Sequence, residues 1–165
     1  MFIGKRNSVE SGLQVAEAFH DLAKSNFDSA VLLQNNGLYN ESAYFYIQSM
    51  EKYVKEQICN KIDISNPYFA EKLRSTGHSL DMSINFLIEI YGTNNEVLKQ
   101  QLEIIFLKTI LKNTVFGKLN SILRYPTYNH HKEKYTLINV DFKDCEQLKQ
   151  MTLNLKSALD SLYKL

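Results

Sequence analysis

A short segment near the end of the chain, residues 122–135, holds the side chains best suited to chemistry. It reads ILRYPTYNHHKEKY and contains Arg124, His130 and His131, in a chain of 165 residues with four histidines. Histidine transfers protons near neutral pH, and arginine offers a permanent positive charge with a planar set of donors. Such a pair suits phosphoryl transfer, because one group moves protons while the other stabilises charge on the phosphoryl oxygens.

Positive charge is concentrated around this segment. The formal net charge of the whole chain is +1, which excludes a uniformly basic nucleic-acid-binding protein but not a local basic surface. No aspartate or glutamate occurs between Ile104 and Lys132, and the cationic residues there are Lys108, Lys112, Lys118, Arg124 and Lys132. This local excess is typical of contact with a phosphate backbone. We expect Tyr128 and Tyr135, with Tyr125, to stack on unpaired bases.

The same residues fit a structural alternative. Arg124 lies at the predicted end of a helix, where a cation interacts favourably with the helix dipole. Pro126 ends such a helix, so Arg124 and the histidines need not share one helical face. Lysines four residues apart, such as Lys108 and Lys112, are typical of a solvated helix face. The residues alone therefore leave open whether Arg124 and the histidines are catalytic.

Composition indicates a single globular domain over residues 1–165. The hydrophobic fraction of 44% and the charged fraction of 22% are close to globular averages, and the length suffices for one core. Cys59 and Cys145 are too few for a disulfide framework, so we expect buried thiols in a reducing cytoplasm. No segment approaches the roughly 18 apolar residues needed to cross a bilayer, and none resembles a signal peptide. We expect no membrane contact, no metal and no cofactor.

Helical spacing of apolar residues covers nearly all of the chain. The predicted helices start between residues 7 and 11 and end at 36, then span 40–58, 67–75, 78–91, 95–123 and 141–165. Asn7 and Glu10 have capping-box spacing, and Gly37 suits a left-handed cap. The pair Asn66-Pro67 is typical of a helix start. These patterns predict an all-α, up-and-down bundle of four to five principal helices.

Two of these helices have explicit predicted core faces. In the long helix the expected face is Leu98, Leu102, Ile105, Thr109, Lys112 and Phe116. In the last helix, capped by Asp141 or Asp144, it is Leu148, Met151, Leu155, Leu159 and Leu162. No strand pattern is apparent, so the polar segment from Tyr125 to Lys143 is expected to be a long loop. Loops of that length are frequently functional.

Three pieces of the chain, in this order, match a known pattern. Residues 38–58 read LYNESAYFYIQSMEKYVKEQI, with the matching positions Ala43, Gln48, Glu51, Lys52 and Lys55. His78 stands two residues before Leu80 at the start of a helix. The segment LRYPTYN is followed by KYT and a final amphipathic helix. Over about residues 13–163 the chain thus resembles the HEPN family (higher eukaryotes and prokaryotes nucleotide-binding domain), in its Arg-Tyr-Pro form.

The resemblance implies a helical, commonly homodimeric protein directed at RNA or nucleotides. Many HEPN proteins are metal-independent endoribonucleases of toxin–antitoxin and phage-defence systems. Their motif is an arginine, four to six residues and a histidine, contributed by both protomers to one cleft. Arg124 is followed by five residues before His130 and six before His131. Active members usually carry a polar residue directly after the arginine, where this chain has Tyr125.

The resemblance also implies roles for individual residues. The catalytic residues would be Arg124 with His130 or His131, and the substrate-binding residues would be Tyr128, Tyr135, Gln48, Lys52 and Lys55. From the residues alone, the polar positions of the second helix fit equally well as solvated pairs three and four residues apart. His20 and His78 are expected to be structural. Two other functions use the same features: a non-catalytic nucleotide-binding module, and a helical partner subunit of a nucleotidyltransferase antitoxin.

Overall fold

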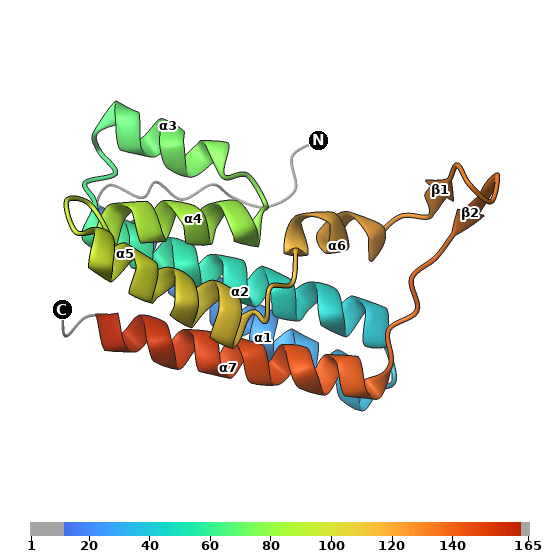
Figure 1. The fold of residues 1–165 in the computed structure, drawn as a ribbon. Coiled ribbons are helices and arrows are strands. Elements are labelled where there is room, and N and C mark those ends of the chain that lie inside the picture. Colours follow the sequence, from blue (N-terminus) through green and yellow to red (C-terminus); the bar gives the residue numbers. More distant parts are fainter. Residues whose placement is uncertain (1–11, 163–165) are drawn as a thin grey trace, which may run out of the picture.

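Three long helices form the centre of the structure, a computed structural model that describes residues 12–162. They are α1 (Gly12–Asn35), α2 (Tyr39–Lys61) and α7 (Phe142–Leu162). α2 contacts both α1 and α7, and the three helices run side by side (Figure 1). Their facing sides carry much of the hydrophobic core, including Ala23, Ile47, Val54, Leu155 and Leu159. The predicted all-α bundle is confirmed.

The turn between α1 and α2 has the geometry expected at Gly37. This glycine has a φ of +75°, a backbone conformation that costs glycine little. The amide of Leu38 donates to the carbonyl of Leu33, and the amide of Gly37 donates to that of Gln34, which is the Schellman arrangement. The helix therefore ends at Asn35, one residue before the predicted end. The predicted capping box at Asn7 and the end at Leu165 lie outside the described residues.

Two shorter helices follow, and both begin with a side-chain cap. In α3 (Pro67–Ser75) the Asn66 side chain accepts a hydrogen bond from the Tyr68 amide, as the Asn66-Pro67 pair predicts. In α4 (Leu80–Tyr91) the Ser79 hydroxyl accepts from the Met82 amide. The first residue of α4 is therefore Leu80, whereas the sequence predicted a start at His78.

The predicted long helix over residues 95–123 is wrong. The chain forms α5 (Glu96–Glu103), a π-helical segment η1 (Ile104–Ile110) and, after a break, α6 (Phe116–Ile122). At the break Lys112 and Asn113 have φ angles of 51° and 57°, which no α-helix allows. Within the predicted core face Leu102 and Phe116 are buried as expected, but Ile105, Thr109 and Lys112 are exposed. The buried row in this part of the chain is instead Leu102, Phe106 and Ile110. Their spacing of four suits the wider turn of a π-helix, whose bonds join residues five apart.

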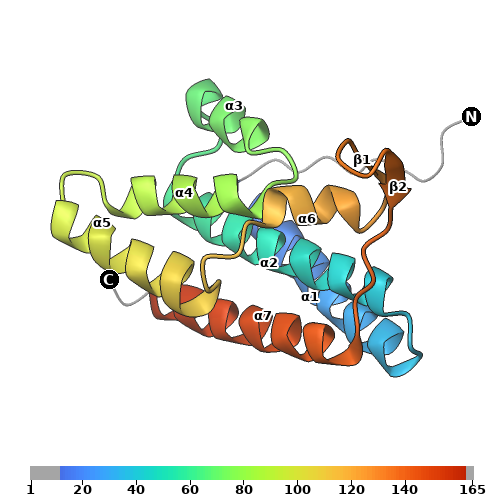
Figure 2. The ribbon, with the colours of Figure 1, turned by 45° about the vertical axis from the view of Figure 1, so that its right-hand side comes forward.

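The segment after α6 contains a small β-hairpin, which corrects the expectation of a plain loop. Strands β1 (Thr127–Asn129) and β2 (Lys134–Thr136) pair antiparallel, with Tyr128 opposite Tyr135. The Asn129 side chain accepts hydrogen bonds from the amides of His131 and Lys132, which shapes the turn. Strands of three residues are too short to show an alternating pattern in the sequence. Figures 1 and 2 show the hairpin projecting from the bundle beyond α6.

The last helix begins at the predicted cap. The side chain of Asp141 accepts from the Asp144 amide and that of Asp144 accepts from the Asp141 amide, so the two form a capping box. The five predicted core positions of α7 are all buried, as are the two cysteines, which are free thiols. Within residues 12–162, no helix is both long enough and apolar enough to span a bilayer.

Candidate functional site

Arg124 stands just beyond the last turn of α6, with most of its hydrogen-bonding capacity unused. Its Nε donates to the backbone oxygen of Asn120 over 3.3 Å. The guanidinium carbon lies 5.3 Å from the ring centroids of both Tyr44, on α2, and Tyr125. Such contacts hold a cation against aromatic faces. Among the described residues no carboxylate forms an ion pair with Arg124, and its side chain is exposed, so the guanidinium is open to an external anion.

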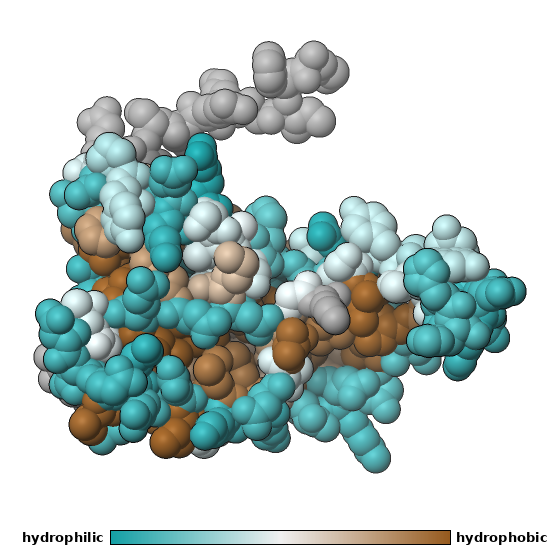
Figure 3. Space-filling view, turned by 45° about the horizontal axis from the view of Figure 1, so that its top comes forward, coloured by the Kyte–Doolittle hydropathy of each residue, from teal (hydrophilic) through white to brown (hydrophobic). Residues whose placement is uncertain are grey.

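The hairpin presents three rings in mutual contact. The Tyr128 ring lies 5.0 Å from that of His130 and 5.3 Å from that of Tyr135, both edge to face. Tyr128 is 42% exposed and Tyr135 is 71% exposed, so the group faces solvent. The neighbouring Lys132 and Lys134 are exposed as well. Figure 3 shows this end of the molecule as a largely hydrophilic projection with apolar surface beside its base.

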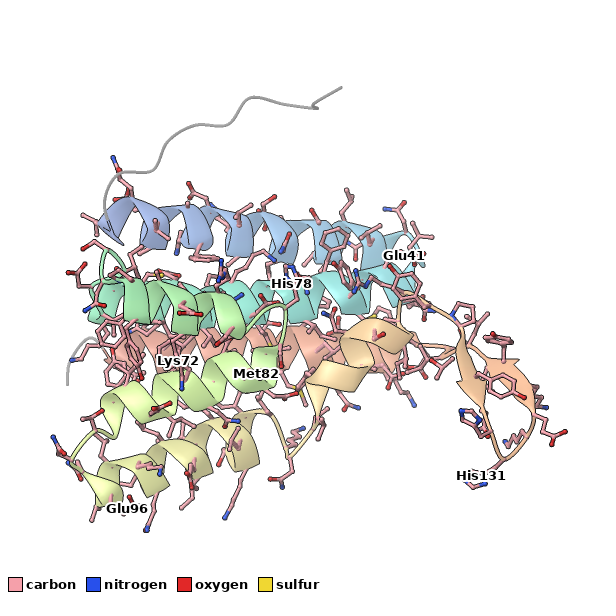
Figure 4. The ribbon with its side chains drawn as sticks, turned by 90° about the horizontal axis from the view of Figure 1, so that it is seen from above. Glu41, Lys72, His78, Met82, Glu96 and His131 are labelled. Carbon is pink, nitrogen blue, oxygen red and sulfur yellow. The ribbon has the colours of Figure 1, made fainter. Side chains whose placement is uncertain are left out.

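Arg124 and the two histidines are not brought together within one chain. In the part of the chain that the structure describes, no hydrogen bond, ion pair or ring contact joins Arg124 to His130 or His131. The histidines lie in the hairpin turn, and Figure 4 shows His131 at the outer end of the hairpin, away from the bundle. A site that uses the arginine with a histidine would therefore need the hairpin of a second copy or a movement of the hairpin.

The polar row of α2 is buried, which excludes the solvated alternative for most of it. Gln48, Glu51 and Lys55 are 6%, 2% and 7% exposed. The Lys55 ammonium donates to Glu51 over 2.7 Å and to the Gly77 carbonyl over 2.5 Å. Gln48 Nε2 lies 3.5 Å from Glu51 Oε2. This cluster fastens α2 to the connection between α3 and α4, because Lys55 reaches the backbone of that connection.

Lys52 differs from its neighbours on α2. It is half-buried and its ammonium donates to the side-chain and backbone oxygens of Gln48, at 3.0 and 3.4 Å. Burial lowers its pKa below the ordinary lysine value; the nearby Glu51 carboxylate opposes this shift and the Lys55 ammonium adds to it. No carboxylate among the described residues forms an ion pair with Lys52. Of the two lysines predicted to line the site, Lys52 is thus the one without an anionic partner.

Asn120 belongs to this cluster and was missed by sequence reasoning. It is 6% exposed; its amide nitrogen donates to the His78 carbonyl over 3.1 Å, and its oxygen accepts from Gln48 over 3.3 Å. The sequence did contain one indication of its burial: Asn120 follows Phe116 by four residues, which places its amide on the apolar face of the predicted helix. His78 itself is exposed, and its Nδ1 lies 3.8 Å from Glu51.

A separate groove lies on another side of α6. Its volume is about 220 Å³, and most of its lining is apolar, from Leu119 and Leu123 of α6 and from Val140, Leu148 and Met151. Neither Arg124 nor the hairpin rings line it. The candidate site is therefore an exposed surface rather than an enclosed pocket.

The chemistry available at this surface is cationic and aromatic. Within the described residues, no three side chains of histidine, cysteine, aspartate or glutamate are grouped closely enough to hold a metal ion. Comparison of the chain with models of known protein families gives no match. Neither the curated proteins nor the solved structures include a significant match to it.

Proposed function

We propose that this chain is an HEPN-like, RNA-directed protein that binds single-stranded RNA through its hairpin and Arg124. The observation that carries the proposal is the exposed group of rings from Tyr128, His130 and Tyr135, held in contact on a projecting hairpin. The resemblance of the Arg-Tyr-Pro segment to HEPN domains supports the same reading. A free nucleotide also carries a base and a phosphate, so it could occupy part of the same surface.

Exposed rings beside cations suit an unpaired strand. A base in a duplex is already stacked on both faces, whereas an unpaired base gains about 1–3 kcal/mol from stacking on an aromatic side chain. Arg124 before the hairpin and Lys132 and Lys134 within it are exposed, and they supply positive charge for the phosphate backbone. We propose that Tyr128 and Tyr135 stack on bases and that Arg124 binds one phosphate. Lys52, eight residues after Tyr44 on α2, would bind a second phosphate. Gln48 and Lys55 are buried and would stabilise this surface without contacting the RNA.

Metal-independent RNA cleavage is the second candidate function. The ribose 2′-hydroxyl would attack the adjacent phosphorus, and the bond from phosphorus to the 5′-oxygen would break. His130 or His131 would accept the 2′-hydroxyl proton and return a proton to the departing 5′-oxygen, so that the products are a 2′,3′-cyclic phosphate and a 5′-hydroxyl. Arg124 would stabilise charge on the phosphoryl oxygens. Since Arg124 does not contact either histidine within one chain, we propose that two copies complete this site. The exposure of both histidines at the end of a projecting hairpin favours such sharing.

RNA binding is tested by fluorescence anisotropy with a labelled single-stranded oligonucleotide. Replacing Tyr128 and Tyr135 together with alanine is expected to raise Kd at least about tenfold, because two stacking contacts are lost. Tyr68→Ala is the matched control, since Tyr68 is 63% exposed on α3, far from the hairpin in sequence. A duplex of the same length should bind more weakly. Equal Kd values for the wild type and the hairpin variant would disprove the proposed contact.

Cleavage is tested on the same RNA in EDTA. Arg124→Ala and the double variant His130→Ala/His131→Ala should both be inactive, whereas His20→Ala on α1 should not change the rate. Mixing the two inactive variants should restore part of the activity if the arginine and the histidine come from different copies, because a mixed dimer then holds one intact site. Binding without cleavage, lost on Arg124→Ala, would instead establish a non-catalytic binding module. Copurification with a nucleotidyltransferase would support the partner-subunit alternative.

A further inference from the structure

The position of Arg124 depends on a helix that cannot stand alone. α6 has seven residues, and isolated helices shorter than about 12 residues are marginal in water. A break in the helical backbone precedes it, and Pro126 follows the arginine closely. The place of the guanidinium is therefore set by the contacts that hold α6 against the bundle.

The first turn of α6 is held at two points. The Asp81 carboxylate of α4 accepts from the Phe116 and Gly117 amides over 3.2 and 2.7 Å. The Phe116 side chain is 1% exposed and lies in the hydrophobic core. Both contacts fix the start of the helix, two turns from Arg124, and leave its end to be held by something else.

Asn120 holds the end of α6. Its buried amide is bonded to the Gln48 side chain on one side and to the His78 carbonyl on the other. Its backbone oxygen accepts the bond from Arg124 Nε. Figure 4 shows His78 over α2, at the point where the segment before α4 crosses that helix. One residue thus joins α2, this segment and the arginine.

The partners of Asn120 are themselves fixed. Gln48 contacts Glu51, and Glu51 forms the buried ion pair with Lys55, which is bound to the Gly77 carbonyl. Every side-chain polar atom that is fully buried in the described residues has a hydrogen-bond partner. A buried, satisfied polar network of this kind specifies one arrangement of its elements, because any shift leaves a polar group without a partner.

We propose that Asn120 is a positioning residue for Arg124. It holds the last turn of α6 so that the guanidinium stays over the Tyr44 ring with its free N–H groups directed to solvent. This inference rests on the proposed function, in which Arg124 contacts an RNA phosphate. Loss of the Asn120 amide removes one of the partners of Gln48 and the side-chain donor to the His78 carbonyl. The end of α6 then moves, because these bonds no longer hold it.

The test is a double-mutant cycle between Asn120→Ala and Arg124→Ala, measured as Kd for single-stranded RNA over a range of salt concentrations. Arg124→Ala should reduce the slope of log Kd against log salt by about 0.7, the value for one phosphate contact on a single strand. Asn120→Ala should raise Kd several-fold and reduce the salt slope toward that of Arg124→Ala. In a protein that already carries Arg124→Ala, adding Asn120→Ala should change neither Kd nor the slope.

A matched control separates positioning from stability. Gln34 is also a buried amide, 4% exposed, and it bonds to Tyr46 and Glu146 rather than to α6. Gln34→Ala should lower Tm as Asn120→Ala does and leave Kd and the salt slope unchanged. Asn120→Ser is a milder change and serves as a second variant in case Asn120→Ala does not fold. Circular dichroism first confirms the fold of each variant, and binding is then measured at 10 °C.

Two failures are distinguishable. If Arg124→Ala leaves Kd and the slope unchanged, the proposed RNA contact of Arg124 is wrong. If Arg124→Ala weakens binding but the Asn120 variants keep the wild-type slope, or add their effect to that of Arg124→Ala, the positioning role is wrong. An effect of Gln34→Ala equal to that of Asn120→Ala would also overturn it.

Discussion

Asp81 caps a helix that begins 35 residues later in the chain. Its Oδ1 accepts from the Phe116 amide and its Oδ2 accepts from the Gly117 amide, at 3.2 and 2.7 Å. The first amides of a helix have no partner within it, and Val115, which precedes α6, supplies no side-chain cap. The start of α6 is thus determined by tertiary contact with α4 rather than by its own sequence.

Replacing Asp81 with alanine should destabilise α6 before the rest of the fold. Loss of an N-cap costs about 1–2 kcal/mol, and both bonds here are made to a charged acceptor. We expect the free energy of unfolding in urea to fall by that amount and hydrogen exchange at the Gly117 amide to accelerate. Asp81→Asn, which keeps one acceptor oxygen, should lose less. Asp21→Ala, at an exposed position on α1, should change stability by less than about 0.5 kcal/mol, and an equal loss there would contradict the cap.

The Asp81 contact also shows where sequence reasoning reached its limit. Helix ends set by neighbouring residues were predictable, as at Gly37, at Asn66 and at the Asp141–Asp144 capping box. The break between η1 and α6 was not, because Lys112 and Asn113 adopt left-handed backbone angles without a glycine or proline to signal it. The residue that caps the new helix precedes its first residue by 35 positions, and no local pattern indicates such a contact.

The candidate site was predictable in composition but not in geometry. The cationic and aromatic residues around Arg124 are visible in the sequence, and the structure does expose Tyr128 and Tyr135. Gln48 and Lys55 are buried because α6 and the connection between α3 and α4 cover that side of α2. The spacing of residues along α2 does not indicate which distant segments will cover it. Asn120 escaped notice for the same reason: its partners come from two distant segments.

Breaking the buried ion pair on α2 should be far more costly than breaking an exposed one. Glu51→Ala leaves the Lys55 ammonium buried without its anion, and we expect a loss of about 3–5 kcal/mol in the free energy of unfolding. The control is Lys156→Ala, which removes a pair with Asp160 spaced by four residues on the surface of α7 and should cost at most about 0.5 kcal/mol. Replacing both partners by Glu51→Leu/Lys55→Met should recover most of the loss. Similar losses for the two single variants, measured in urea, would contradict the burial of the pair.

Glycine should be tolerated at Lys112 and not four residues earlier. Lys112 has a φ of 51°, a conformation that costs a residue with a side chain about 1 kcal/mol. Glycine avoids this cost, and the gain offsets the extra backbone entropy that glycine brings to the unfolded chain. Lys112→Gly is therefore expected to leave Tm nearly unchanged. Lys108→Gly, within the π-helical segment, has no such compensation and should lose about 1 kcal/mol. If Lys112→Gly is the more destabilising of the two, the left-handed conformation is wrong.

Burial of Cys59 should make stability decline at alkaline pH. The side chain is 4% exposed, and burial raises the pKa of its thiol from 9.0 to about 12, although the Lys55 ammonium opposes the shift. A raised pKa means that the folded protein holds the proton more tightly than the unfolded chain. The stabilisation is therefore complete below pH 9 and is lost as the pH rises toward 12. Wild type should lose up to about 2 kcal/mol more than Cys59→Ala between pH 8 and pH 10.5, measured by urea unfolding at each pH. Burial also raises the pKa values of Tyr46, Tyr53 and Tyr91, but these tyrosines affect the wild type and Cys59→Ala equally. Parallel stability profiles for the two proteins would therefore contradict the prediction, because the Cys59 thiol would then ionise as freely in the folded protein as in the unfolded chain.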